Sequence, residues 1–206
     1  MEYPLQLIEV MLPSGPQPIY QPDINFVKKQ FDEGRMDSFP YWSKLWPAAV
    51  AISTYLEQHS HLIKSKKVLE LAAGLGLPSL VSARYAAEVI CTDLDEDAVK
   101  IAHLSALHCG IKNMRCEVLN WNNIPNDFEA DTVLLSDVNY DANDFPDLLR
   151  VIQNFRENGT QIMLATPQRM VAKSFAESLL PFCKEQEMIS ATAPNGLTAD
   201  VSILIL

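Results

Sequence analysis

Two acidic residues flank a stretch of the chain in which side chains are nearly absent. Glu70 precedes the sequence LAAGLGLPS, where Gly74 and Gly76 alternate with apolar residues, and Asp93 follows Gly76 by 17 residues. Small residues at a strand-to-helix turn let the backbone approach a ligand, and an acid about 20 residues further on accepts hydrogen bonds from ribose hydroxyls. This spacing predicts a nucleoside-binding site. The alternative is a tight packing turn with no ligand.

The negative charge of Glu70, directly before this turn, distinguishes between two kinds of nucleoside ligand. A dinucleotide site prefers G-x-G-x-x-G with a pyrophosphate at the helix N-terminus, but here Ser79 stands at the place of the third glycine. Glu70 would be unfavourable beside a pyrophosphate and favourable beside a cation. We therefore expect a positively charged nucleoside, with a nicotinamide dehydrogenase as the last alternative.

A second stretch, LLSDVNYDANDF, carries Asp137 and Tyr140 directly after an apolar run. A carboxylate can orient an ammonium group, and an aromatic ring can pack on its methylenes and its cationic head. We interpret these two residues as the acceptor site for an amine. The alternative is that Asp137 is a helix N-cap, a role that Asp141 or Asn143 could also fill.

The elements that must position these residues alternate from about residue 46 onward. Short apolar and β-branched runs predict buried parallel strands, and helical patterns lie between them. The expected fold is α/β, a doubly wound, mostly parallel sheet that ends in an antiparallel hairpin. The strands are expected at 67–71, 89–92, 114–118, 132–135 and 161–165, and the hairpin at 187–192 and 200–206.

Helices are expected to cover this sheet, and the start of the chain differs from the rest. The first 40 residues alternate around a Ser-Gly-Pro turn, which predicts a hairpin or arm. We divide the chain into an N-terminal arm, 1–40, and a cofactor-binding domain, 41–206. The helices are expected at about 95–109, in a segment with Phe145, Leu148, Leu149, Ile152 and Phe155 at helical spacing, and after Pro167 with Val171, Phe175 and Leu179 on one side.

Composition limits the possible classes of protein. The chain has 206 residues, 48% of them hydrophobic, which is enough for one core. No apolar run approaches the roughly 20 residues that span a bilayer, and the N-terminus does not resemble a signal peptide, so we expect a cytoplasmic protein without membrane attachment. The net charge of −10 opposes nucleic-acid binding. The four cysteines lack the spacing of metal ligands, so free thiols and no metal are expected.

The first stretch has the form Glu70-x-Ala72-x-Gly74-x-Gly76, followed by Asp93. It resembles the cofactor loop of the class I, seven-strand S-adenosylmethionine-dependent methyltransferases, over roughly residues 40 to 206. Ala72 departs from the glycine that is more frequent in that family. The resemblance implies a Rossmann-like methyltransferase fold with seven strands, S-adenosyl-L-methionine as cofactor, and these five residues as part of its site.

Two tryptophan-containing segments extend the resemblance. VLNWNN, with Asn120 and Trp121, is similar to the segment that flanks the adenine in one group of these enzymes. There an aromatic ring can cover the base and Asn120 can hydrogen-bond its amine, although Trp121 could also be ordinary core. YWSKLWPAA is similar to the aromatic segment that closes over the methionine end of the cofactor. Because packing on the sheet accounts for one tryptophan, we select only Trp46.

The Asp137-x-x-Tyr140 motif lacks the two prolines of nucleic-acid methyltransferases and resembles the non-SET protein-lysine methyltransferase branch. The implied reaction is methyl transfer to a lysine amine of a protein. A lysine has a pKa near ~10.4 and is protonated at neutral pH, and a nearby anion favours that form. We hypothesise that Asp137 captures the amine, that the cationic cofactor lowers its pKa, and that water or Asp137 takes the proton. Tyr140 would shape the channel.

Other functions remain open at this point. A small-molecule N- or O-methyltransferase would use the same cofactor residues, and a non-catalytic cofactor-binding protein would keep the same fold. Arg169, which follows the fifth expected strand, is a further candidate for substrate contact. The sequence does not identify the acceptor, the number of methyl groups transferred or the oligomeric state.

Overall fold

The structure is a computed structural model that describes residues 3–125 and 128–206. Within these residues the chain forms a seven-stranded sheet, called here the main sheet, and a two-stranded N-terminal hairpin. The predicted α/β fold is therefore confirmed, and each predicted strand ends within two residues of its expected position. In spatial order the main sheet contains β5 (Met114–Val118), β4 (Glu88–Asp93), β3 (Lys67–Leu71), β6 (Thr132–Ser136), β7 (Gln161–Pro167), β9 (Thr198–Ile205) and β8 (Glu185–Thr192).

The order of the strands creates a crevice in the middle of the main sheet. The strands from β5 to β7 are parallel, whereas β9 pairs antiparallel with both β7 and β8. From β3 the chain continues outward to β4 and β5 on one side, and then returns to β6 on the other. Ligands bind where the strand order reverses in this way, beyond the carboxyl ends of the strands. The fold therefore points to the ends of β3 and β6.

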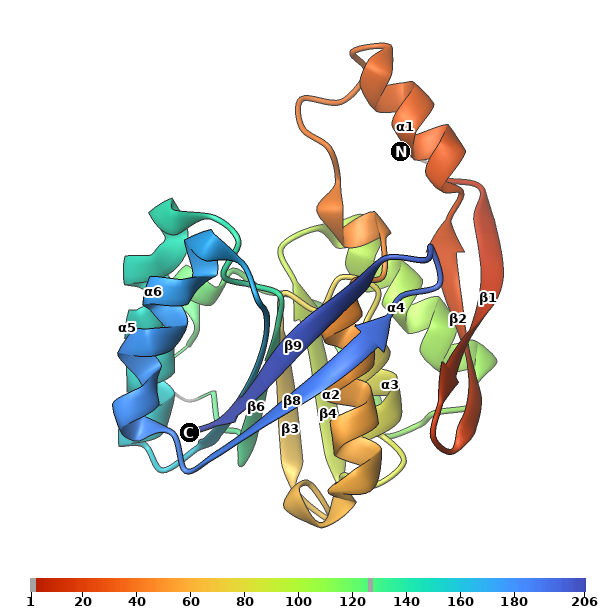
Figure 1. Ribbon diagram of the computed structural model, residues 1–206. Helices are drawn as coiled ribbons and strands as arrows, with labels where there is room; N and C mark the ends of the chain where they lie inside the picture. The colour runs from red at the N-terminus through yellow and green to blue at the C-terminus, as the bar shows by residue number, and fades with distance from the viewer. Residues whose placement is uncertain (1–2, 126–127) are drawn as a thin grey trace.

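Helices cover both faces of the main sheet (Figure 1), and each face has its own apolar cluster. Successive side chains of a strand point to opposite faces, so Val68 joins one cluster and Leu69 the other. One face is covered by α2 (Pro47–Gln58), α3 (Leu77–Ser82) and α4 (Glu96–His108), and the other by α5 (Phe145–Glu157) and α6 (Met170–Leu179). Short 3-10 turns occur at Tyr41–Ser43, Ser60–Leu62, Trp121–Asn123, Ala142–Asp144 and Leu180–Phe182.

The N-terminal hairpin, β1 (Leu5–Leu12) and β2 (Gly15–Pro22), packs beside α4. Its Ile19 is fully buried in the cluster that also contains α2 and α3. At the turn, Ser14 Oγ donates to Glu57 Oε1 at 2.6 Å, and Arg84 Nη1 donates to the same oxygen at 2.8 Å. The hairpin thus shares a core with the main sheet, and the domain boundary at residue 40 stays a prediction.

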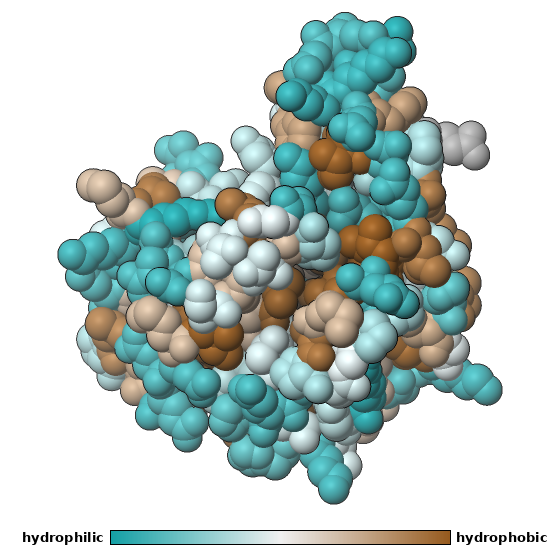
Figure 2. Space-filling model, turned by 45° about the vertical axis from the view of Figure 1, so that its right-hand side comes forward, coloured by the Kyte–Doolittle hydropathy of each residue, from teal (hydrophilic) through white to brown (hydrophobic). Residues whose placement is uncertain are grey.

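The helix α1 (Ile24–Asp32) follows the hairpin and forms the projecting end of the molecule (Figure 1). The surface of this end is mostly hydrophilic (Figure 2). In the residues that the structure describes, no helix is both long and apolar enough to cross a membrane.

One predicted helix face is wrong in part. Phe175 and Leu179 of α6 are buried as expected, but Val171 is 42% exposed and Ala172 is buried in its place. The apolar stripe runs through residues 172, 175 and 179, at the spacing of one helix face, and Val171 lies beside it. The side chain of Val171 therefore points toward solvent near the start of α6.

Gly76 is predicted to be essential for packing. Its φ is +76°, and an added Cβ would lie 2.9 Å from Cys91 Sγ and 3.2 Å from Ala102 Cβ. Gly159 has nearly the same φ, +79°, with no described heavy atom within 4 Å of such a Cβ. We expect Gly159→Ala to lower the free energy of unfolding by about 1 kcal/mol through backbone strain alone. Gly76→Ala should lower it by about 1–3 kcal/mol more, because the neighbours must also move.

Urea unfolding followed by circular dichroism measures both variants. Equal losses in the two would show that the contact with β4 and α4 does not matter.

Candidate active site

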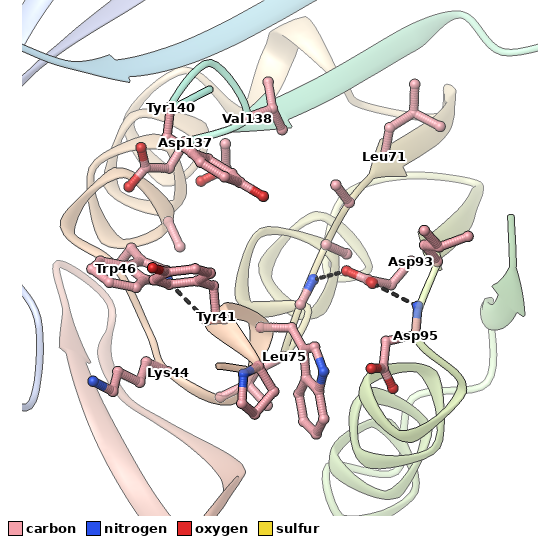
Figure 3. Close-up of a pocket in the computed structure, with 18 of the residues that line it drawn as sticks. Tyr41, Lys44, Trp46, Leu71, Leu75, Asp93, Asp95, Asp137, Val138 and Tyr140 are labelled. Carbon is pink, nitrogen blue, oxygen red and sulfur yellow. Dashed lines mark hydrogen bonds between the residues drawn. The ribbon is translucent and has the colours of Figure 1, made fainter. Parts of the chain in front are cut away.

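A cavity of about 760 Å³ lies at the carboxyl ends of β3, β4 and β6 (Figure 3). This volume falls within the range of about 300–1,000 Å³ that is typical of small-molecule sites. Its walls come from the loop after β3, the end of β4, the loop after β5, the end of β6, and the segment that precedes α2. The cavity therefore occupies the crevice that the strand order predicts.

The loop after β3 contributes backbone to this cavity. Ala72, with φ +50°, and Gly74, with φ +54°, both line it. An added Cβ at Gly74 would lie 3.3 Å from the carbonyl oxygen of Trp42, so the loop passes closely beneath the segment that carries this tryptophan. The small residue at position 74 is explained by this protein contact as well as by access to a ligand.

Asp93 holds this loop against the end of β4. Its Oδ2 accepts a hydrogen bond from Gly74 N at 2.7 Å, and its Oδ1 accepts one from Asp95 N at 2.9 Å (Figure 3). Burial raises the pKa of Asp93, and these backbone N–H groups oppose the rise. Each carboxylate oxygen can accept a further hydrogen bond, so Asp93 can still receive ribose hydroxyls.

Glu70 does not reach the cavity, although we expected it to bind the cofactor. It is absent from the described residues that line the cavity, and it is almost fully buried. Its Oε2 accepts hydrogen bonds from Ser79 N at 2.9 Å and Ser79 Oγ at 2.5 Å, in the first turn of α3. Burial raises the pKa of Glu70 to about 8. Glu70 therefore serves the start of α3 from within the core.

Gly76 also lies apart from the lining residues, against Cys91 and Ala102. Its small size is needed for packing between α4 and the main sheet. Of the five residues predicted from the loop motif, the structure thus brings Ala72, Gly74 and Asp93 together at the cavity.

Aromatic side chains from the segment before α2 form another wall. Trp46 lines the cavity as predicted, and its Nε1 donates to the carbonyl oxygen of Tyr41 at 3.0 Å. Trp42, which we had not selected, also lines the cavity, and its buried Nε1 has no hydrogen-bond partner in the part of the chain that the structure describes. Tyr3 contacts Trp42 edge to face, with ring centroids 5.4 Å apart. The segment YWSKLW contained a signal for Trp42, whereas no pattern pointed to Tyr3.

Asn120 and Trp121 lie together in the loop after β5, and both line the cavity as predicted. Asn120 Oδ1 accepts a hydrogen bond from Asn122 N at 2.9 Å, which starts a short 3-10 turn. Trp121 is half-buried and also packs against the cluster beneath α5. The two interpretations of Trp121, as core and as cavity wall, therefore both hold.

Asp137 and Tyr140 lie across the cavity from Asp93 (Figure 3). Asp137 is not a helix N-cap, because Asp141 fills that role by accepting a hydrogen bond from Asn143 N at 2.9 Å. Asp137 has φ +57°, and its N–H donates to the carbonyl oxygen of Ala165 at 3.0 Å. This bond continues the pairing of β6 with β7 and fixes the carboxylate at the cavity edge.

Asp137 is paired with Arg169, a contact that our hypothesis of amine capture did not include. Arg169 Nη2 donates to Asp137 Oδ2 at 2.9 Å, and Arg169 Nη1 lies 2.7 Å from Asp137 Oδ1. Burial raises the pKa of Asp137, and the guanidinium of Arg169 opposes the rise. An amine at this site therefore meets a carboxylate that is already paired.

The fold and the cavity define a class I, Rossmann-like S-adenosylmethionine-dependent methyltransferase. The structure is similar to that of the tRNA (uracil-54, C5)-methyltransferase of Pyrococcus abyssi in complex with S-adenosyl-L-homocysteine, with a TM-score of 0.55 and 16% identity. The match covers 75% of this chain and 38% of that one, and it shows the fold alone. A family model described as lysine methyltransferase matches residues 36–180, and the chain belongs to that family. This membership implies S-adenosyl-L-methionine as the cofactor.

Curated relatives are named as protein methyltransferases. The chain is 31% identical to the histone-arginine methyltransferase METTL23 of Homo sapiens, over 66% of this chain and 75% of the relative. It is 30% identical to the electron transfer flavoprotein beta subunit lysine methyltransferase of Mus musculus, over 64% of this chain and 52% of the relative. The chain thus spans about half to three quarters of the length of the curated relatives it matches.

The cavity fits this cofactor. The buried Nε1 of Trp42 is a donor that the cofactor's carboxylate would satisfy, and carboxylates suit a sulfonium and an ammonium group. The lining includes one lysine, Lys44, and five aspartates, namely Asp37, Asp93, Asp95, Asp137 and Asp144.

The raised pKa of Glu70 predicts a pH-dependent stability. Because its pKa of about 8 in the folded protein exceeds the ordinary value, its contribution to stability is complete at low pH and is lost as the pH rises toward 8. Glu70→Gln keeps an acceptor for Ser79 and removes the titration. We expect the difference in melting temperature, variant minus unmodified protein, to increase from pH 5 to pH 9. The cofactor affinity should be unchanged. A difference in melting temperature that stays constant across this pH range would contradict the raised pKa of Glu70.

The position of Asp93 predicts a large effect on cofactor binding. Asp93→Asn removes a charged acceptor for ribose, and its amide nitrogen cannot accept one of the two backbone hydrogen bonds that hold the loop. The Kd for S-adenosyl-L-homocysteine in calorimetry should therefore rise about 10- to 100-fold. Asp37→Asn is the matched control, because Asp37 lines the same cavity but is exposed. A similar rise in both variants would mean that general negative charge, and not the hydrogen bonds that Asp93 accepts, sets the affinity.

Proposed function

We propose that this protein transfers a methyl group from S-adenosyl-L-methionine to the side-chain amine of a lysine in another protein. The observation that carries the proposal is the open acceptor end of the cavity. Tyr41 and Tyr140 both line it, are 55% and 51% exposed, and have ring centroids 6.0 Å apart. A side chain that protrudes from a protein can reach Asp137 past these exposed rings, whereas a metabolite enzyme would favour a closed pocket.

The surface beside this opening supports a protein partner. Met170 is 97% exposed and directly follows Arg169, which contacts Asp137. Exposed methionine and tyrosine side chains are typical of surfaces that bind proteins. The acidic lining of the cavity and the net charge of −10 favour an acceptor segment that is rich in cations.

When bound, S-adenosyl-L-methionine supplies an electrophilic methyl group, which passes to the amine nitrogen while the electron pair of the broken carbon–sulfur bond stays on sulfur. The protein has to align the amine and exclude water. The rings of Tyr41 and Tyr140 pack on the methylenes of the lysine and limit the directions in which it can enter. Asp137 marks the depth at which the amine stops.

Lysine is favoured over arginine as the acceptor because it loses its proton more readily. The amine has a pKa near ~10.4, whereas a guanidinium stays protonated to above about 12. Asp137 is already paired with Arg169 and is a poor base for removing the more tightly held proton of an arginine guanidinium. Arginine methylation, the activity in the name of one relative, is an outcome that the experiment below can detect.

We also propose that the acceptor is a cytoplasmic protein and that nucleic acid is not a partner. The net charge of −10 supports the second of these statements, because a phosphate backbone would be repelled.

The proposal predicts labelled lysine after incubation with tritiated S-adenosyl-L-methionine and a heat-treated cell lysate. Amino-acid analysis of the protein fraction separates methyl-lysine from methyl-arginine, and mass spectrometry identifies the acceptor. Label in arginine, or only in small molecules, would contradict the proposal.

Asp137→Asn is the matched inactive variant, because Asn tolerates the left-handed φ of this position and keeps the shape of the side chain. It should lose most of the transfer, with the Kd for S-adenosyl-L-homocysteine changed less than about threefold, since Asp137 lies across the cavity from Asp93.

A further inference from the structure

Arg169 approaches Asp137 from outside the cavity. Asp137 is among the described residues that line the cavity, and Arg169 is not. The two side chains meet through one hydrogen bond at 2.9 Å and one ion-pair contact at 2.7 Å, with the Asp137 side chain buried and the Arg169 side chain 35% exposed. Asp137 therefore stands between Arg169 and the space that the acceptor would enter.

Both partners are held by the main sheet. Gln168, the residue before Arg169, is tied to β9, because its N–H donates to the carbonyl oxygen of Asp200 and its Nε2 donates to Ser202 Oγ, each at 3.0 Å. Asp137 is tied to β7 through Ala165. Arg169 stands at the N-cap position of α6 but makes no side-chain capping hydrogen bond, so the helix does not require its guanidinium.

The pair changes what an amine experiences at this site. An unpaired carboxylate within a few ångströms favours the ammonium form of a lysine, yet only the neutral amine can accept a methyl group. A guanidinium on the far side of the carboxylate cancels most of that effect. At the same time, contacts to both oxygens fix the orientation of the carboxylate.

We propose that Arg169 is a positioning residue of the acceptor site, which cancels the charge of Asp137 so that a lysine amine is bound in its neutral, reactive form after its ammonium ion has released a proton to water. This inference rests on the function proposed above and adds to it the means by which the acceptor loses its proton. It also resolves the conflict in the simpler hypothesis, in which Asp137 alone would hold the amine as an ammonium ion.

Other charged and titratable groups face the same space and remain in place when Arg169 is changed. Those that line the cavity are Tyr140 and Asp144 on the chain after β6, Asp93 and Asp95 at and beyond the end of β4, Asp37, Tyr41 and Lys44 in the segment before α2, and Tyr3 near the start of the chain. Asp141 interacts electrostatically with Tyr140. Because the charged residues of the described lining are aspartates except for Lys44, removal of Arg169 leaves the site strongly negative.

The decisive variant is Arg169→Gln. The probe is the initial rate of tritium transfer from labelled S-adenosyl-L-methionine to lysine in a heat-treated, dialysed lysate, measured from pH 6 to pH 10. We expect the alkaline rise of the rate to move upward by about one to three pH units, as for an amine placed beside an uncompensated carboxylate. At pH 8 the rate should fall at least about tenfold. The Kd for S-adenosyl-L-homocysteine should not change, because Arg169 does not line the cavity.

Two further variants guard against a purely structural explanation. Lys173→Gln removes a cation from the same helix, where Lys173 Nζ lies 3.8 Å from Glu177, and should leave the pH profile unchanged. Arg169→Lys keeps the charge, so it should preserve the profile even where it lowers the rate. If Arg169→Gln does not fold, a displaced profile in Arg169→Lys still overturns the proposal.

The experiments distinguish an error in the proposed function from an error in the proposed role of Arg169. If the unmodified protein labels no lysine although it binds S-adenosyl-L-homocysteine, the proposed function is wrong. If it labels lysine and Arg169→Gln shows the unmodified pH profile, the role of Arg169 is wrong and the function stands.

Discussion

The parallel pairing of β3 with β4 and β6 is the constraint on which the site depends. Because these strands run in the same direction, their carboxyl ends meet at one edge of the main sheet. Asp93 and Asp137, 44 residues apart in the sequence, therefore face each other across one cavity. The aromatic segment before α2 crosses this edge and forms the remaining wall of the cavity.

Three buried carboxyl groups lie near this edge, and each is stabilised in a different way. Glu70 takes up a proton readily, since burial raises its pKa to about 8. Asp93 receives two backbone N–H groups, and Asp137 receives a guanidinium. A carboxylate without such partners would be costly at these depths. The partners also differ in what they leave available: both hydrogen bonds to Glu70 come from Ser79 in the core, Asp93 keeps the capacity to accept further hydrogen bonds at the cavity, and the charge of Asp137 is paired with Arg169.

Local patterns predicted the strands, and eight of the ten site residues selected from the sequence line the cavity, because strand ends and turn residues are set by neighbours in the sequence. The failures have a different origin. Glu70 was misplaced because the direction of a side chain at the end of β3 depends on how α3 packs against it. The partner of Asp137 was missed because Arg169 is 32 residues away and reaches it only through the pairing of β6 with β7. Such contacts require the assembled sheet.

The small residues that first suggested a ligand site have more than one cause. Gly74 makes room for the backbone at Trp42, and Gly76 makes room for Cys91 and Ala102 beneath α4. Ala72, where the resembling family more often has glycine, adopts φ +50° at a strain of about 1–2 kcal/mol. A left-handed turn that is closed on two sides by protein can present its remaining backbone to a ligand without adjustment. The glycine motif therefore indicates a rigid, closely packed turn. The backbone of that turn is in place to contact a cofactor because the turn is rigid.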